Sequence, residues 1–306
     1  MKKTIILLSV LSLLVLSCSK KKLEETASYS NGFKKSEIVI GTFNLEWFGD
    51  GINDRKDRTE TDYKHYAEII KKIDADILGL EEIENSGAMN KLISYLPDYA
   101  YYITKEGGQQ KCALLYRKNI NVKFVAEYSP IAVEGNKTRP GLLVSASAGN
   151  FNFMVMVVHL KSSSHFENTE AKRERSIEIR TAQSTVLAKW ADSVLAKGNE
   201  TDLIVVGDFN DTPKRKKNNT LYPLMNQMTF LTENEKSCKY RSAYVIDHIV
   251  VSRNASKRFK DNSLFVYDIF SLYNDQDTKS LSDHCPIIAK FDVNEQDLDR
   301  KQVAKK

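Results

Sequence analysis

Apolar segments that end in charged residues constrain the fold of this chain more than any other feature. Residues 203–206 (LIVV) form a continuous apolar run, which is typical of a strand buried on both faces. Asp208 and Asn210 follow two residues apart, so in an extended backbone their side chains point the same way. Another apolar run begins directly after Asp283 and His284. Burying such groups is costly unless they bind a metal or a substrate, so the pattern predicts an active site.

The chain is long enough for one large domain or two ordinary ones, with 306 residues of which 42% are hydrophobic. No linker separates residues 37 and 293, and strand patterns alternate irregularly with helical ones. Helical spacing of apolar residues, or helix-favouring composition, occurs in three segments: 61–73, 86–96 and 167–196. Many strands interrupted by helices without strict alternation predict two packed β-sheets with helices outside.

The N-terminus has the pattern of an export signal. Lys2 and Lys3 precede an apolar run over residues 4–16, which is too short to span a bilayer comfortably. The following VLSC resembles a bacterial lipobox, in which the cysteine, here Cys18, becomes lipidated. Leu16 stands where a smaller residue is usual, so an ordinary cleaved signal is the alternative. We expect an exported protein, either a membrane-anchored lipoprotein of a bacterial cell envelope or a secreted protein if Cys18 is not lipidated.

These patterns divide the chain into four parts. Residues 1–18 are the expected signal peptide with its lipobox, and 19–36 are a flexible tether. Residues 37–294 form the folded domain, and 295–306 form a polar tail. A net charge of +5 is compatible with an anionic partner but does not require one.

Cysteine content leaves the pairing open. With Cys18 assigned to a lipid, Cys112, Cys238 and Cys285 remain, and three thiols cannot form a complete disulfide framework. One pair is possible in an oxidising compartment, but the spacing does not identify it.

Polar residues occur at expected strand ends in six places. They are Asn44, Glu82, His159, Asp208 with Asn210, Asp247, and Asp283 with His284. Each residue alone has an ordinary explanation as a turn residue or a structural histidine. Together they form a set of carboxylates, amides and imidazoles in equivalent places, which favours one shared site.

The same segments resemble the endonuclease/exonuclease/phosphatase superfamily, which includes deoxyribonucleases, abasic-site endonucleases, inositol polyphosphate 5-phosphatases and bacterial sphingomyelinases. The segments that carry the resemblance are 42–47 (TFNLEW), 76–85 (DILGLEEIEN), 158–162 (VHLKS), 207–211 (GDFND), 246–249 (IDHI) and 282–286 (SDHCP). The resemblance implies an α/β four-layer sandwich, in which two mixed β-sheets pack face to face and helices cover their outer faces. It places the active site at one edge of the sandwich.

The resemblance also implies a divalent metal, with Mg²⁺ expected and Mn²⁺ or Ca²⁺ possible. Mg²⁺ prefers oxygen ligands. Glu82 is the expected carboxylate ligand, and Asn44 would place an amide oxygen beside it. Glu81 stands where the family often has glutamine, and its alternative role is a solvated neighbour on the opposite strand face.

The catalytic roles follow from the same resemblance. His284 would accept a proton from the attacking water, with Asp283 orienting the imidazole ring. Asp208 would align that water, and Asn210 would hold a phosphate oxygen.

A second histidine completes the expected catalytic set. His159 would donate to a phosphate oxygen or to the leaving group, with Asp247 orienting its ring. His248, next to Asp247 on a strand, should face away from the site. Arg139 and Lys161 are the expected phosphate-binding residues.

The expected enzyme is a metal-dependent phosphoesterase, with a nuclease that hydrolyses DNA, and possibly RNA, as the favoured form. Residues 214–217 (KRKK) could contact backbone phosphates, although simple solvation is the favoured explanation of this charged loop. The alternatives are a phosphatase or phosphodiesterase of inositol phosphates or sphingomyelin, and a lipid-anchored binding module with an inactive site. The expected partners are nucleic acid and, through the anchor, a membrane. A monomer without protein partners is expected.

Overall fold

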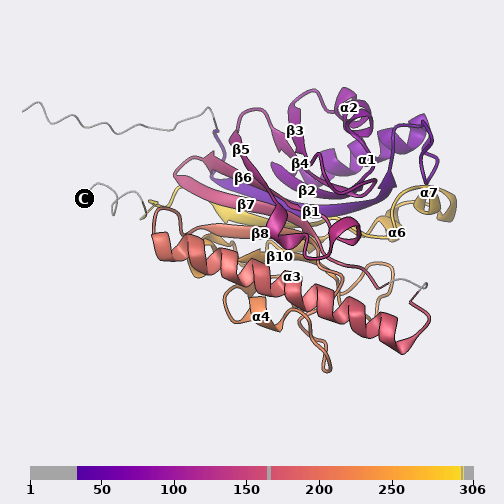
Figure 1. The fold of residues 1–306 in the computed structure, drawn as a ribbon. Coiled ribbons are helices and arrows are strands. Elements are labelled where there is room, and N and C mark those ends of the chain that lie inside the picture. Colours follow the sequence, from indigo (N-terminus) through magenta and orange to yellow (C-terminus); the bar gives the residue numbers. More distant parts are fainter. Residues whose placement is uncertain (1–32, 164–166, 298, 300–306) are drawn as a thin grey trace, which may run out of the picture.

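Two six-stranded mixed β-sheets pack face to face and carry helices on their outer faces (Figure 1). The computed structural model describes residues 33–163, 167–297 and 299. Almost all of the expected signal peptide and tether, including Cys18, therefore lies outside the described residues. No helix in the described part of the chain is both long and apolar enough to cross a membrane.

The first sheet contains, in spatial order, β11 (Phe265–Val266), β12 (Ile287–Asp292), β1 (Glu37–Phe48), β2 (Ile77–Ile83), β4 (Lys111–Arg117) and β3 (Tyr99–Ile103). The second contains β5 (Asn121–Tyr128), β6 (Gly141–Ala148), β7 (Phe151–His159), β8 (Leu203–Asp208), β10 (Asp247–Val251) and β9 (Thr229–Phe230). Both sheets are mixed, because β1–β2 and β7–β8 are parallel pairs and the other pairs are antiparallel.

Three helices complete the outer layers: α1 (Glu60–Ile73) and α2 (Ser86–Ser94) on the first sheet, and α3 (Glu170–Lys197) on the second (Figure 1). α1 begins at a capping box of Thr59 and Asp62, and α3 ends at Gly198 in the left-handed conformation. The short helices are α4 (Tyr222–Met225), α5 (Arg253–Arg258), α6 (Ile269–Leu272) and α7 (Asp275–Ser280), with 3₁₀ turns at Ser129–Ile131 and Gly135–Lys137.

The alternation of β1 between two cores shows why the sheets pack face to face. Ile38 and Ile40 point between the sheets, where they join Val157 and Val206 of the second sheet. Val39 points the other way, into the core beneath α1 and α2. Both faces of the strand are thus buried. The predicted four-layer α/β sandwich is confirmed.

The strand directions bring the expected site residues to one edge. The carboxyl ends of the parallel strands β7 and β8 lie together, and His159 pairs with Asp208 there. The antiparallel strand β10 begins at the same place, so Asp247 also pairs with Asp208. β12 begins opposite Thr42 on β1, which puts His284 beside the end of β1. The register of the second sheet therefore places Asp208 directly between His159 and Asp247.

Two further findings concern the cysteines and the C-terminus. Cys238 and Cys285 form a disulfide, while Cys112 is a buried free thiol. Within the expected polar tail, Asp297 accepts a hydrogen bond from Asn152 and is buried, so this part of the segment packs on the domain.

Gly207 has a backbone φ of +145°, and a Cβ at this position would collide with the carbonyl of Val158 on β7. We expect Gly207→Ala to lower the free energy of unfolding by about 2–4 kcal/mol, because strain and overpacking add. Urea denaturation measures this. Gly135→Ala is the control, since nothing lies within 4 Å of its added Cβ. Equal stability of the two variants would contradict the steric argument.

Candidate active site

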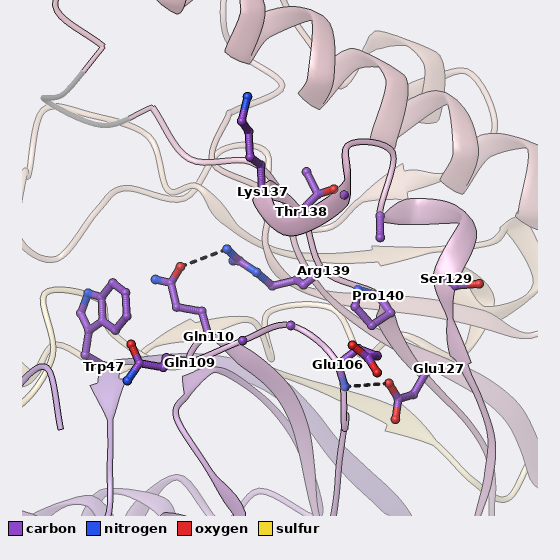
Figure 2. Close-up of a pocket in the computed structure, with 14 residues that line it drawn as sticks. Trp47, Glu106, Gln109, Gln110, Glu127, Ser129, Lys137, Thr138, Arg139 and Pro140 are labelled. Atoms are coloured by element: carbon purple, nitrogen blue, oxygen red, sulfur yellow. Dashed lines mark hydrogen bonds between the residues drawn. The ribbon is translucent and has the colours of Figure 1, made fainter. Parts of the chain in front are cut away.

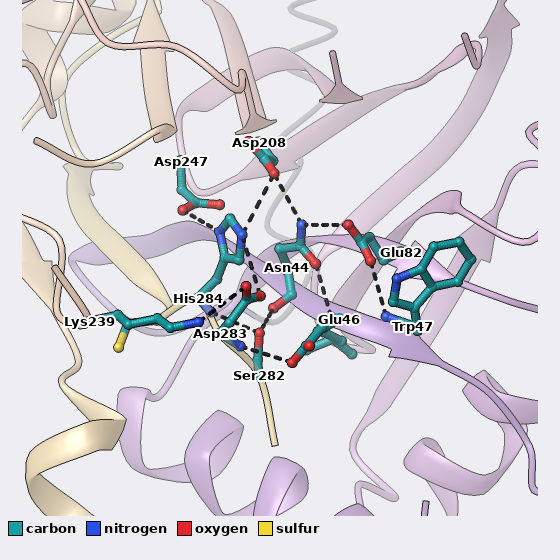
Figure 3. Close-up of polar contacts among 12 residues, drawn as sticks. Asn44, Glu46, Trp47, Glu82, Asp208, Lys239, Asp247, Ser282, Asp283 and His284 are labelled. Atoms are coloured by element: carbon teal, nitrogen blue, oxygen red, sulfur yellow. Dashed lines mark hydrogen bonds and ion pairs between the residues drawn. The ribbon is translucent and has the colours of Figure 1, made fainter. Parts of the chain in front are cut away.

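Asn44 joins the two sheets at the centre of the polar group (Figure 3). Its amide nitrogen donates to Asp208 Oδ2 at 3.1 Å and to Glu82 Oε1 at 3.4 Å. Its amide oxygen accepts from the backbone N–H of Glu46 at 2.9 Å, which fixes the orientation of the amide. The amide nitrogen thus holds two carboxylates together, and the expectation that the amide oxygen also binds a metal stays a prediction.

Glu82 and Glu81 have different environments, although they are neighbours. Glu82 Oε2 accepts from Trp47 N at 3.1 Å, and its Oε1 lies 3.9 Å from His159 Nε2. Glu81 is fully buried and accepts from Thr42 Oγ1 at 2.8 Å. Burial, followed by the charge of Asp247, raises the pKa of Glu81 well above its usual value. The alternative of Glu81 as a solvated neighbour is therefore wrong, and Glu82 is the glutamate that faces the site.

Backbone irregularities aim these side chains. Non-glycine residues with positive φ gather at the site, namely Glu46 (48°), Trp47 (51°), Glu82 (61°) and Asn210 (51°). The ladders beside them are irregular, with register shifts in β1 between Asn44 and Phe48 and in β2 between Leu80 and Ile83. Bulges and strained residues commonly re-aim side chains at functional sites. Here they turn Glu82 toward the polar group while Glu81 stays between the sheets.

The catalytic histidine has a different carboxylate partner from the expected one. His284 Nδ1 lies 2.7 Å from Asp247 Oδ2, whereas Asp283 Oδ1 lies 3.6 Å from Nε2. The side chain of Asp283 is 43% exposed and lies 3.4 Å from Lys239 Nζ. The expectations that Asp283 orients His284 and that Asp247 orients His159 are both wrong, because the His284 ring contacts Asp247 at the start of β10. Asp247 and His284 form a hydrogen-bonded carboxylate–imidazole pair, the arrangement that a base and its orienting residue require.

The pKa values of the two histidines are shifted in opposite directions. For His284, burial lowers the pKa, but the negative charge of Asp247 and its hydrogen bond outweigh burial and raise the pKa well above 6.5. For His159, burial and then the charge of Arg139 lower the pKa well below 6.5. His159 is therefore neutral near pH 7. A neutral ring suits a hydrogen-bond donor to phosphate better than an acid that protonates a leaving group.

The site concentrates negative charge, and this fits a cation. Asp208, Asp247 and His284 place ligand atoms within 4.8 Å of one another. Burial and then Asp247 raise the pKa of Asp208 to about 7, so its charge is poorly compensated. Asp247 Oδ1 is buried and has no hydrogen-bond partner in the described part of the chain. Carboxylate oxygens with unused lone pairs suit a hard divalent ion, with Glu82 at the edge of the group.

Arg139 borders the same cavity as Trp47 (Figure 2). Its Nη2 donates to Gln110 Oε1 at 3.0 Å, and its Nη1 is buried without a partner among the residues that the structure describes. Because an amide orients Arg139 without neutralising it, the guanidinium keeps both its charge and a free donor. Both are needed to bind a phosphate oxygen.

The remaining expected residues differ in how directly they reach the site. Asn210 donates to Leu160 O at 3.2 Å, which leaves a second amide hydrogen. Lys161 is paired with Glu167 at 2.8 Å, so its contact with phosphate stays a prediction. His248 is bonded to Thr232 and to the carbonyl of Asp211, away from the site as expected.

Sequence reasoning missed the supports around these residues. Ser282 Oγ donates to the carbonyl of Asn44 at 2.6 Å and accepts from His284 N at 3.0 Å, which ties the loop before β12 to β1. Lys56 Nζ lies 2.6 Å from Glu46 Oε2. The order Ser282-Asp283-His284 was visible, but nothing in the sequence gave Ser282 a partner 238 residues away.

The two-sheet sandwich and its edge cluster of carboxylates and histidines define a class, the metal-dependent phosphoester hydrolases. Within that class the chain belongs to the Endonuclease/Exonuclease/phosphatase family, whose model matches residues 41–284. Members of this family are phosphoesterases that use divalent metal. No curated protein sequence matches the chain.

Solved structures agree on the fold. A truncated TDP2 from Caenorhabditis elegans is 18% identical, with a TM-score of 0.61 over 85% of this chain and 99% of that one. An endonuclease/exonuclease/phosphatase family protein from Bacteroides thetaiotaomicron is 14% identical, with a TM-score of 0.58 over 84% and 98%. A mannosyl-6-phosphatase from the same species is 15% identical, with a TM-score of 0.55 over 82% and 98%. At these identities the likeness concerns the fold alone.

Glu82→Gln should raise the Mg²⁺ concentration needed for half-maximal activity and lower turnover by at least ~100-fold, since a charged ligand is lost. A metal titration of phosphoester hydrolysis measures both effects. Glu68→Gln, an exposed change on α1, is the control. A titration of Glu82→Gln like that of the unmodified protein would remove Glu82 from the site.

Asp247→Asn should move the rising limb of kcat/KM against pH to lower pH. A base must be deprotonated to act, and Asp247 raises the pKa of His284, so activity should climb through and above neutral pH in the unmodified enzyme. Removing the negative charge of Asp247 lowers the pKa of His284, so the rising limb of the pH profile moves to lower pH. The exposed Asp283→Asn should move it less. A larger movement with Asp283→Asn would restore Asp283 as the orienting residue.

Proposed function

We propose that the protein is a divalent-metal-dependent phosphodiesterase that cleaves nucleic acid, with DNA as the first candidate and RNA as the second. The observation that carries this is a buried Arg139 donor without a partner among the described residues, close to Glu82 and Asp208, together with the Asp247–His284 pair. Such an arrangement can hold a phosphate between a cationic donor and a base. The filled set of site residues speaks against an inactive binding module.

The proposed mechanism assigns one task to each group. His284 takes a proton from the attacking water while Asp247 holds the ring and stabilises its positive charge. As the water oxygen bonds to phosphorus, the ester P–O bond breaks; the leaving oxygen takes a proton from solvent, and His284 later returns its proton to solvent. Asp208, between the two histidines, aligns that water. Arg139, Asn210 and neutral His159 donate to the phosphate oxygens as negative charge develops in the transition state. A divalent cation held by Glu82 and its neighbouring carboxylates would add Lewis-acid polarisation of the phosphate.

Location and assembly are also part of the proposal. The Cys238–Cys285 disulfide supports an oxidising compartment, because disulfides persist outside the reducing cytosol. We keep export, with a membrane anchor at Cys18, as the proposed location. The protein is proposed to act as a monomer without protein partners.

A substrate panel tests the nuclease proposal, using plasmid DNA, RNA, sphingomyelin and inositol phosphates, each with Mg²⁺ or EDTA. We expect metal-dependent cleavage of nucleic acid that falls steeply with salt, because phosphate contacts release counterions. Arg139→Gln should weaken cleavage and reduce the salt dependence by about one contact. The exposed Lys123→Gln is the control. Hydrolysis of inositol phosphate or sphingomyelin, with nucleic acid intact at every salt, would favour the alternative functions.

A further inference from the structure

Two cavities flank the catalytic group. One, of about 690 Å³, is bordered by Trp47, Gln110 and Arg139 (Figure 2). The other, of about 320 Å³, is bordered by Asp247 and His284. In Figure 3 the two sides are seen together, with Trp47 and Glu82 on one side, His284 and Asp283 on the other, and Asn44 between them. A phosphate bound in the middle would thus have room for a substituent on each side, as a diester requires.

The smaller cavity is closed by a short loop, residues 236–244, which we call the tyrosine loop. Its ends pair as an isolated antiparallel bridge between Lys236 and Tyr244, and Ser237 N donates to Ala243 O at 3.0 Å. Lys236 Nζ also lies 3.3 Å from the centre of the Tyr244 ring. These contacts give the loop a defined shape.

Two contacts attach the tyrosine loop to the catalytic segment. Cys238 is bonded to Cys285, the residue directly after His284. The next residue, Lys239, pairs with Asp283 at 3.4 Å (Figure 3). The loop is therefore joined, covalently and by charge, to both neighbours of the catalytic histidine. It follows that any group bound by the loop is held at a fixed distance from the reacting phosphate.

Tyr240 borders this cavity and is 63% exposed. An exposed aromatic ring next to a catalytic centre offers a flat face for stacking. The cavity also has apolar borders from Val266 and Ile287. Its charged borders are paired, Asp247 with His284 and Asp283 with Lys239. Its volume is near the lower end for small-molecule sites, which suits one planar ring system better than an acyl chain.

We propose that this cavity is a subsite for a planar aromatic substituent of a phosphodiester, such as a nucleobase, that Tyr240 stacks on it, and that the Cys238–Cys285 disulfide positions Tyr240. The proposal rests on the proposed phosphodiesterase function and narrows it to diesters with an aromatic group next to the scissile phosphate. Tyr240 is a specificity-determining residue here, because it contacts the substituent and not the reacting atoms.

The test compares thymidylyl-thymidine with two analogues in which one or the other thymine is replaced by hydrogen. The unmodified protein should prefer the full dinucleotide over one analogue by about tenfold in kcat/KM, the scale of a single stacking contact. Tyr240→Ala should abolish that preference and Tyr240→Phe should keep it. Tyr222→Ala, an equally exposed tyrosine on α4, is the matched control and should keep it too.

A separate variant, Cys238→Ser, tests whether the disulfide positions Tyr240. Cys238→Ser should reduce the preference as Tyr240→Ala does, because the loop loses its covalent attachment. A preference that survives in Cys238→Ser would overturn the positioning role of the disulfide. A preference that survives in Tyr240→Ala, or equal loss on all three substrates, would overturn the subsite itself.

Calorimetric binding of thymidine monophosphate separates the subsite from the reaction. If no diester is cleaved but Tyr240→Ala weakens this binding about tenfold relative to Tyr222→Ala, the subsite stands and the phosphodiesterase proposal fails. If diesters are cleaved without any dependence on Tyr240 in rate or binding, the function stands and the subsite fails.

Discussion

Repulsion between carboxylates buried at the strand ends is the constraint on which the site depends. Asp208 and Asp247 face each other across β8 and β10, and Glu82 approaches from the other sheet. Each carboxylate has a specific polar neighbour. Asn44 donates hydrogen bonds to Glu82 and Asp208, and His284 is hydrogen-bonded to Asp247. The compensation is incomplete, as the raised pKa of Asp208 shows. This repulsion is the physical reason why the edge of the sandwich suits a cation.

Much of the fold could be predicted from the sequence, because it depends on periodicity. The spacing of Tyr66, Ile69 and Ile73 indicated α1, and the apolar run before Asp208 indicated β8. The expected site residues also converge, since strand ends meet at one edge. Their pairing could not be predicted, because it depends on the direction in which each side chain crosses between strands. Proximity in sequence suggested Asp283 for His284, whereas Asp247, 37 residues away, is the hydrogen-bonded partner.

Irregular backbone and tertiary contacts account for the other differences between the expected site and the observed one. Side chains alternate along a regular strand, so Glu81 and Glu82 are expected on opposite faces. The sequence does not indicate which of the two lies between the sheets. The positive φ of Glu82 and the register shift in β2 decide this. The disulfide pairing could likewise not be predicted, because three thiols allow several pairs. Only the fold brings Cys238 and Cys285 together. Such features depend on tertiary contacts that leave no periodic trace in sequence.

The position of β12 also governs when the polar edge of the sandwich can be assembled. This last strand lies between β11 and β1, so the end of the chain completes the sheet that its beginning started. A growing polypeptide that has not yet reached residue 284 lacks both this strand and His284. Pairing over so great a sequence separation forms late and slowly. The topology therefore leaves the polar edge of a partly synthesised chain incomplete until β12 pairs with β1.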